Sequence, residues 1–382
     1  MKCSSIAQTG YKPSFNRESN IELFRIITMF FIVSHHYVVN SGLTAFDGPI
    51  VANPLSANSI FLLLFGAWGK IGINCFVMIT GYFMCKSNIT LKKFIKLFGE
   101  IMFYKIIIGL IFLLTKYEPI SIKTCVKMFL PVSQVRANFT GCYIIFFLFI
   151  PFLNVLINNM TEKQHIKLLL LVSFTYVFFG TIKLMPVTMN YVSWFMVLYL
   201  ISSYIRLYPK EIFLKQNLWG LLTITSIVLC CLSVVCCTWL SVKFNRNLWY
   251  FFVTDSNTFL AVVVGICSFI FFKNVKIKQC FFINTIASTT FGILLIHANC
   301  DAMRRFLWQD LCQNVKVYDS QFMPLIAIGC VVAVFVVCSF IDWLRIKLVE
   351  APFMRKILLL EPKFLMWWNK KEEKLCKKFN VN

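Results

Sequence analysis

The stretch Asn20-Ile-Glu-Leu-Phe-Arg-Ile-Ile-Thr-Met-Phe-Phe-Ile-Val-Ser-His-His36 decides how this chain folds. It belongs to an apolar run of about twenty residues, which is long enough to cross a bilayer as a helix. An ionisable side chain inside such a helix costs roughly 2.5 kcal/mol or more unless it faces a polar interior. Arg25, His35 and His36 therefore indicate a functional site that faces the inside of a helix bundle.

Helix geometry selects between the two histidines. Arg25 and His36 are eleven residues apart, which at about 100° per residue is three turns plus roughly 20°. His35 points about 80° away from this direction. Arg25 and His36 thus share one face, separated by about 16 Å along the axis, and we predict that both belong to one functional site.

The composition excludes an ordinary soluble domain, because 59% of the 382 residues are hydrophobic and the mean hydropathy is +0.74. Repeated apolar runs predict an all-α, polytopic membrane bundle of about ten transmembrane helices. The first twenty residues are polar and no small-residue cleavage site follows, so we predict no removable signal peptide. The predicted spans lie near residues 21–43, 58–84, 99–115, 141–158, 167–184, 191–208, 217–240, 249–272, 281–299 and 323–344.

The distribution of basic residues predicts the orientation of these helices. Most of the 38 lysines and arginines fall in the N-terminal segment, the alternate loops on the same side and the C-terminal tail. The positive-inside rule then places both termini in the cytoplasm. We expect a cytoplasmic N-terminal segment at 1–20, a transmembrane domain at 21–345 and a basic tail at 346–382 that lies on the membrane surface.

Two other function classes are disfavoured by the sequence. The net charge of +22 is scattered between apolar runs and forms no long basic face, so we expect no nucleic-acid partner. The sixteen cysteines include four in one apolar run at 230–237, with no histidine at metal-ligand spacing. We therefore predict buried apolar cysteines and no metal site.

Several polar groups near the predicted membrane boundaries are candidate binding residues. Lys92, Lys93 and Lys96 follow the second span, where lysines serve either as a topology signal or as a phosphate site. His297 ends the ninth span at a depth similar to His36, and Asp255 opens the eighth span near the same level. We predict an outward-facing cavity lined by His36, His297 and Asp255.

Three smaller expectations concern single elements. We expect His165 to be exposed and inert in a polar turn capped by Thr161. Asp342 can pair with Arg345 at helical spacing. The loop at 116–140 is long enough for a short helix against the bundle.

Motifs spread over nearly the whole chain resemble those of the acyltransferase-3 family. The motifs are Glu22-Leu-Phe-Arg25 with ten residues to His36, Gly-x-Asn-x-Phe followed by Ile79-Thr-Gly-Tyr-Phe83, Trp194-Phe with Tyr199 and Tyr204-Ile-Arg206, and Thr290-Phe-Gly-Ile-Leu-Leu-Ile-His297. The family consists of bacterial integral-membrane enzymes of about ten helices that O-acylate surface polysaccharides, usually with acetyl from cytoplasmic acetyl-CoA. The resemblance implies that His36 is the catalytic histidine and Arg25 its partner.

The resemblance also implies the substrates and the location. It predicts an O-acetyltransferase of the bacterial cytoplasmic (inner) membrane that uses acyl-CoA as donor substrate and a cell-surface or lipid-linked glycan as acceptor, with no permanently bound cofactor. Many members carry an Arg-x-x-Arg element after the second span that is associated with the donor. Here Lys93-x-x-Lys96 stands in its place, which keeps point charge but lacks the planar bidentate fork of arginine.

Two other function classes stand as alternatives to the enzyme. A transporter or flippase of lipid-linked sugars also needs many helices and buried charges, but the chain shows no internal repeat and no matching pair of broken helices. A structural subunit of a polysaccharide synthase would leave Arg25 and His36 without a task. The sequence leaves open whether transfer is direct or passes through an acyl-enzyme on His36, His297 or a cysteine, and it does not indicate an oligomeric state.

Overall fold

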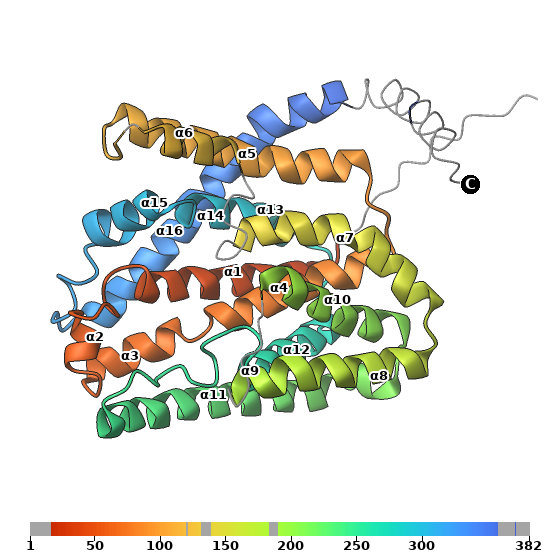
Figure 1. The fold of residues 1–382 in the computed structure, drawn as a ribbon, viewed down its shortest axis with the longest axis horizontal. Coiled ribbons are helices and arrows are strands. Elements are labelled where there is room, and N and C mark those ends of the chain that lie inside the picture. The colour runs from red at the N-terminus through yellow and green to blue at the C-terminus, as the bar shows by residue number, and fades with distance from the viewer. Residues whose placement is uncertain (1–16, 120, 131–138, 183–189, 358–370, 372–382) are drawn as a thin grey trace, which may run out of the picture.

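All regular structure in the described part of the chain is helical. The computed structural model describes residues 17–119, 121–130, 139–182, 190–357 and 371 (Figure 1). The predicted N-terminal segment up to residue 16 and most of the predicted tail lie outside these residues. The fold class predicted from the apolar runs, an all-α membrane bundle, is confirmed.

Seven helical segments of the described residues are long and apolar enough to cross a bilayer, or up to eight if one bent pair counts as a single span. The predicted number of about ten is not confirmed, since α10 (Tyr191–Leu207) and α12 (Phe259–Asn274) are apolar but shorter. The seven segments are α1 (Ser19–Val39), α3 with α4 (Ala57–Gly66, Gly69–Met84), α5 (Leu91–Leu114), α7 (Phe139–Asn159), α8 with η1 and α9 (Glu162–Val172, Ser173–Phe178, Phe179–Thr181), α11 (Gln216–Phe244) and α16 with η4 (Met323–Arg345, Ile346–Glu350, helical to Ile357).

The remaining elements are short connectors and one bent pair. The bent pair joins α13 and α14 to α15 and η3 at an angle of 97°. These elements are α2 (Pro49–Ala52), α6 (Ile122–Phe129), η2 (Glu211–Leu214), α13 (Phe281–Ser288), α14 (Thr290–His297), α15 (Asp301–Arg305) and η3 (Phe306–Leu311). The short helix expected in the 116–140 loop is therefore present as α6.

Helix α1 runs through the middle of the bundle, between α5 on one edge and α11 on the other (Figure 1). It packs against α3, α4, α12, α13, α14 and α16. A Cβ at Gly69 would lie 2.2 Å from the His35 ring, so only glycine permits α4 to approach α1 this closely. We call the end where α1 begins the Arg25 end and the end where it finishes the His36 end.

The predicted span at 249–272 is wrong in its first half. Residues 245–258 form turns, and α12 begins only at Phe259. Polar side chains in this segment bond to backbone instead of facing solvent: Thr258 Oγ1 donates to Asp255 O, and Asn257 Nδ2 donates to Tyr176 O. The local bond of Thr258 competes with the helical ladder, and the bond of Asn257 ties this segment to another element, so the helix starts late.

Three other boundaries also differ from the predicted ones. Helix α5 begins at Leu91, where Thr90 Oγ1 accepts from Lys93 N, so the lysine element is helical and not part of a loop. The predicted span at 281–299 breaks at Thr289, whose hydroxyl donates back to Ile286 O. At the other end of the chain, the helix of α16 continues through η4 past residue 344, where the predicted span ends.

Candidate active site

His36 and His297 form a hydrogen-bonded pair at the His36 end of the bundle. His36 Nδ1 lies 2.9 Å from His297 Nε2, and the ring centroids are 5.1 Å apart. The two residues come from α1 and α14, which are 261 positions apart in the chain. The prediction that both histidines lie at one level is confirmed, and the structure adds that they touch.

The hydrogen bonds of His297 assign the protons of a neutral pair. His297 Nδ1 lies 2.6 Å from Ile293 O, and because a carbonyl only accepts, Nδ1 carries the hydrogen. In a neutral ring Nε2 then carries a lone pair and accepts from His36 Nδ1–H. Neutral His36 consequently presents its lone pair on Nε2, which has no hydrogen-bond partner among the described residues. This nitrogen is free to accept a proton from a substrate.

His297 is held in place by its surroundings. It is completely buried, and Trp308 of η3 lies edge-on to its ring at 6.4 Å. Trp308 also contacts Tyr37 at 5.7 Å, so α1, α14 and η3 meet around the pair. His36 is only half-buried by comparison. The buried histidine is positioned to orient the more accessible one.

His35 points elsewhere, as the helical geometry predicts. Its Nδ1 lies 2.5 Å from Gly66 O, and its ring packs against Gly69. A carbonyl acceptor and a glycine contact fix the side chain between α1, α3 and α4. The structure thus gives His35 a packing role.

Arg25 lies at the opposite end of α1 from His36. Its Nη1 is 3.5 Å from Glu22 Oε2, and its side chain is 23% exposed. Eleven residues of unbroken helix separate Arg25 from His36, a rise of about 16 Å, which is more than an arginine side chain can span. The two predicted catalytic residues therefore share a face without contacting one another.

Asp255 pairs with a lysine and not with the histidines. Its Oδ1 lies 3.7 Å from Lys70 Nζ, which also donates to Tyr191 OH at 2.8 Å. Lys70 directly follows Gly69, which packs against His35 beside His36. Asp255 therefore lies at the His36 end, as predicted. It contacts Lys70, which also binds Tyr191, and this cluster was not predicted from the sequence.

The three predicted donor lysines are used differently from one another. Lys96 Nζ lies 2.7 Å from Glu350 Oε1 in an ion pair, and Lys93 Nζ donates to Asn88 O at 2.9 Å. Lys92 is exposed and has no polar partner among the described residues. Two of the three ammonium groups are thus engaged within the protein, at the Arg25 end.

The prediction for His165 is wrong. The side chain is completely buried, with Nε2 3.0 Å from Leu200 O and the rings of Tyr204 and Tyr208 at 5.3 and 5.8 Å. The predicted Thr161 cap is present as a full capping box. It starts α8 before His165, so this residue falls on the helix face that packs against α10 and not in a turn.

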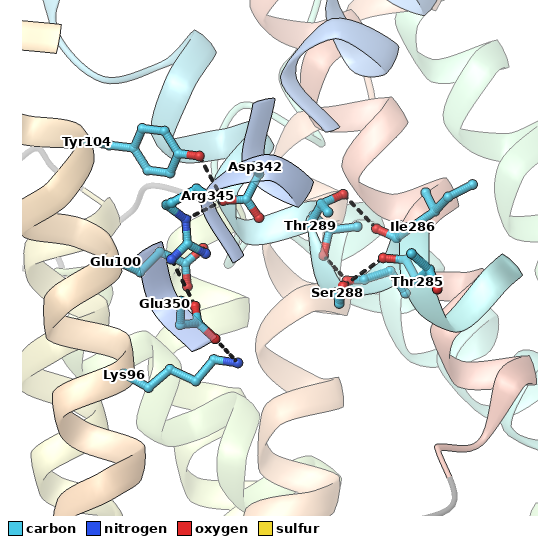
Figure 2. Close-up of polar contacts among 12 residues, drawn as sticks. Lys96, Glu100, Tyr104, Thr285, Ile286, Ser288, Thr289, Asp342, Arg345 and Glu350 are labelled. Atoms are coloured by element: carbon cyan, nitrogen blue, oxygen red, sulfur yellow. Dashed lines mark hydrogen bonds and ion pairs between the residues drawn. The ribbon is translucent and has the colours of Figure 1, made fainter. Parts of the chain in front are cut away.

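A buried ionic cluster around Arg345 was only partly foreseen (Figure 2). The expected pair is present, with Arg345 Nε 2.6 Å from Asp342 Oδ1. Arg345 Nη1 and Nη2 also bind Glu350 at 2.8 Å and Glu100 at 3.1 Å. The π-helical turn of η4 brings Glu350 back to Arg345. The cluster ties α5 to α16 in the interior.

One feature of the sequence indicates the cluster members that the predicted Asp342–Arg345 pair leaves out. Glu100 stands at the start of an apolar run, and an intramembrane carboxylate implies a buried partner. Tyr104 donates to Asp342 Oδ1 at 2.8 Å, four residues beyond Glu100 on the same face of α5. Pattern alone does not show which cation this face meets, because α5 and α16 are more than 200 residues apart.

Comparison with known proteins supplies the family. The family model described as an acyltransferase domain matches residues 18–343, which include α1, α14 and both members of the histidine pair. No curated protein and no solved structure matches the chain. A match over most of the chain, together with several apolar helices long enough to span a bilayer, shows that this protein belongs to the acyltransferase-3 family and is a membrane acyltransferase.

Proposed function

We propose that the enzyme transfers an acetyl or other acyl group from acyl-CoA to a hydroxyl of a cell-surface or lipid-linked glycan. One observation carries this proposal: the hydrogen bond between His36 Nδ1 and His297 Nε2, which leaves His36 Nε2 as a free base. A histidine whose other nitrogen is fixed by a hydrogen bond is suited to remove a proton from a hydroxyl.

The reaction then follows from the position of that base. His36 Nε2 takes the proton as the glycan oxygen attacks the thioester carbonyl, and the new C–O bond gives a tetrahedral intermediate. The intermediate collapses with cleavage of the C–S bond, and the CoA sulfur leaves with the proton from His36. The products are the glycan ester and CoA, and His36 returns to its neutral state.

Arg25 is proposed to act on the donor and not on the oxyanion. About 16 Å of helix separates it from His36, so one thioester cannot contact both. A positive charge at the Arg25 end fits the phosphate-bearing half of CoA. Lys92, Lys93 and Lys96, at the start of α5, lie at the same end of the bundle. We place this end in the cytoplasm of a bacterium and the His36 end at the outer face of its inner membrane.

The acceptor is proposed to enter at the His36 end. His297 orients the base, and Asp255 with Lys70 offers a carboxylate and an ammonium for sugar hydroxyls beside it. Both are hydrogen-bonding groups of the kind that hold a polar substrate. The donor and the acceptor would thus approach the histidine pair from opposite ends of the bundle.

Radiolabelled acetyl-CoA tests the proposal with purified protein and a panel of oligosaccharide acceptors. Label in an oligosaccharide, lost in His36→Ala and retained in His35→Ala, supports the enzyme. Movement of a lipid-linked oligosaccharide across a vesicle membrane without label would favour the flippase. Retention of full transfer in His36→Ala would exclude the histidine pair as the base.

A further inference from the structure

Arg206 lies at the Arg25 end with most of its donors unused. It ends α10, stacks on the Tyr82 ring at 4.4 Å and donates from Nη1 to Tyr82 OH at 2.6 Å. Its Nε is buried and has no hydrogen-bond partner among the described residues. A buried donor without a partner is destabilising until a ligand supplies an acceptor. The contacts with Tyr82 therefore fix the orientation of the guanidinium, while its Nε donor lacks an acceptor.

A second cation stands close to Arg206. Lys273 ends α12, is half-buried, and lies one helical turn beyond Phe269, whose ring centroid is 5.5 Å from that of Tyr82. Its Nζ bonds to the neutral amide of Asn274 at 3.0 Å. No described carboxylate is within salt-bridge distance of either cation, although exposed Glu18 is near Lys273 and exposed Lys86 adds another positive charge near Arg206. The cluster as a whole is positive.

Helix ends give part of the reason for these charges. α4, α10 and α12 all finish here, and basic residues in the last turn interact favourably with the helix dipole. That effect does not require Arg206 Nε to be buried and unpaired, nor the guanidinium to be clamped on Tyr82. The start of α1 also lies here, since Asn20 Nδ2 donates to Phe272 O and Lys273 O. Its positive end adds to the attraction for an anion.

The distance from this cluster to the histidine base matches the length of the acyl-bearing arm of CoA. Tyr82, which holds Arg206, is thirteen residues along α4 from Gly69, which packs against His35, and this is a rise of about 20 Å. The extended arm of CoA from its pyrophosphate to its sulfur contains thirteen bonds and spans about 16 Å at ordinary bond lengths. The bond to the acyl carbon and the lengths of the Arg206 and His36 side chains account for the difference between these two lengths. A pyrophosphate at Arg206 would thus put the thioester beside the histidines.

We propose that Arg206 and Lys273 bind the pyrophosphate of the acyl-CoA donor. This inference rests on the proposed function, and it assigns the phosphates of CoA to two places. Arg206 and Lys273 take the pyrophosphate, from which the acyl arm extends toward His36. The lysine element at the start of α5, Lys92 with Lys93 and Lys96, is assigned to the 3′-phosphate on the ribose. Arginine suits the inner position because its planar fork binds phosphate oxygens in pairs.

Ligand binding to the purified full chain tests the assignment. We expect Arg206→Gln and Lys273→Gln each to weaken binding of CoA and of 3′-dephospho-CoA by about 10-fold to 100-fold, because both ligands carry the pyrophosphate. Pantetheine, which has no phosphate, should bind these variants and the wild type alike. Lys163→Gln, an exposed lysine at the start of α8, is the matched control and should change nothing. Arg206→Lys, which keeps the charge but not the fork, should give an intermediate loss.

An anionic lipid headgroup is the other source of the same phosphate chemistry. The measurements are therefore repeated in nanodiscs of phosphatidylcholine with and without phosphatidylglycerol. Unchanged CoA affinity in the Arg206→Gln/Lys273→Gln double variant overturns the assignment, and phosphatidylglycerol binding that alone depends on Arg206 would give the site to lipid. If CoA binding depends on Arg206 but no oligosaccharide acceptor becomes labelled from acetyl-CoA, the anion site is supported and the proposed acyl transfer is contradicted.

Discussion

His36 Nδ1 and His297 Nε2 lie within 2.9 Å of one another, although the two residues are 261 positions apart in the sequence. The contact joins α1 to α14 and leaves Nε2 of His36 as the unprotonated nitrogen of a neutral pair. His35, the immediate neighbour, is instead bonded to Gly66 O. Adjacent histidines thus have different tasks, and the variants of each should behave differently.

Replacement of His36 by alanine should lower kcat for acyl transfer by about 10²-fold to 10⁴-fold, the usual contribution of a general base. His35→Ala should cost less, because that side chain contributes packing. Initial rates with radiolabelled acetyl-CoA measure both, and gel filtration in detergent checks that the variants fold. An inactive His35→Ala variant together with an active His36→Ala variant would show that His35, and not His36, points toward the catalytic site.

His297 should act as a positioning residue. His297→Ala removes the acceptor for His36 Nδ1–H, and we expect kcat to fall by at least about 10-fold with the donor KM unchanged. His297→Gln keeps an acceptor oxygen near the same place and should restore part of the rate. The kcat and KM of the two variants are compared over a range of pH. Equal losses in both variants would assign His297 a purely structural role.

The lysine element should discriminate between donors by their 3′-phosphate. Changing Lys93 and Lys96 together to glutamine should raise the KM for acetyl-CoA more than it lowers kcat, since contacts far from the thioester contribute uniform binding. The effect should weaken at high salt. The KM for acetyl-3′-dephospho-CoA should not respond. An unchanged KM for both donors would leave these lysines as a topology signal only.

The Arg345 cluster should be a stability element. Asp342→Ala leaves the buried Arg345 Nε and the Tyr104 hydroxyl without their acceptor and should destabilise the protein by about 1–3 kcal/mol. Asp301 and Arg304 form an exposed pair with the same spacing, 2.9 Å apart, so Asp301→Ala is the matched control and should have almost no effect. Thermal unfolding in detergent compares the two. Equal unfolding temperatures would mean that the cluster does not hold α5 to α16.

The orientation of the bundle can be tested by chemical labelling. With the native cysteines removed, single cysteines at Val39 and Asn299 should react with a membrane-impermeant thiol reagent applied to intact cells. Both positions follow the histidine pair at the His36 end. Labelling only after the cells are opened would reverse the topology, and with it the direction of acyl transfer.

The fold class and the orientation of Arg25 and His36 on α1 follow from the amino-acid sequence alone. Hydropathy is a property of each segment, so an all-helical membrane bundle is predicted without knowledge of any contact. The placing of Arg25 and His36 on one face needs only the helical repeat. The late start of α12 was not predictable in this way, because Asn257 bonds to Tyr176 O on another element.

The packing of the helices selects which polar groups meet. His36 with His297, Asp255 with Lys70, and Arg345 with Glu100 each join distant parts of the chain. His165 was misplaced for the same reason, since its burial depends on α10. Inside a bilayer a charged or hydrogen-bonding side chain is costly without a partner. The sequence therefore shows that such partners exist, and only the packing of the helices decides which residues they are.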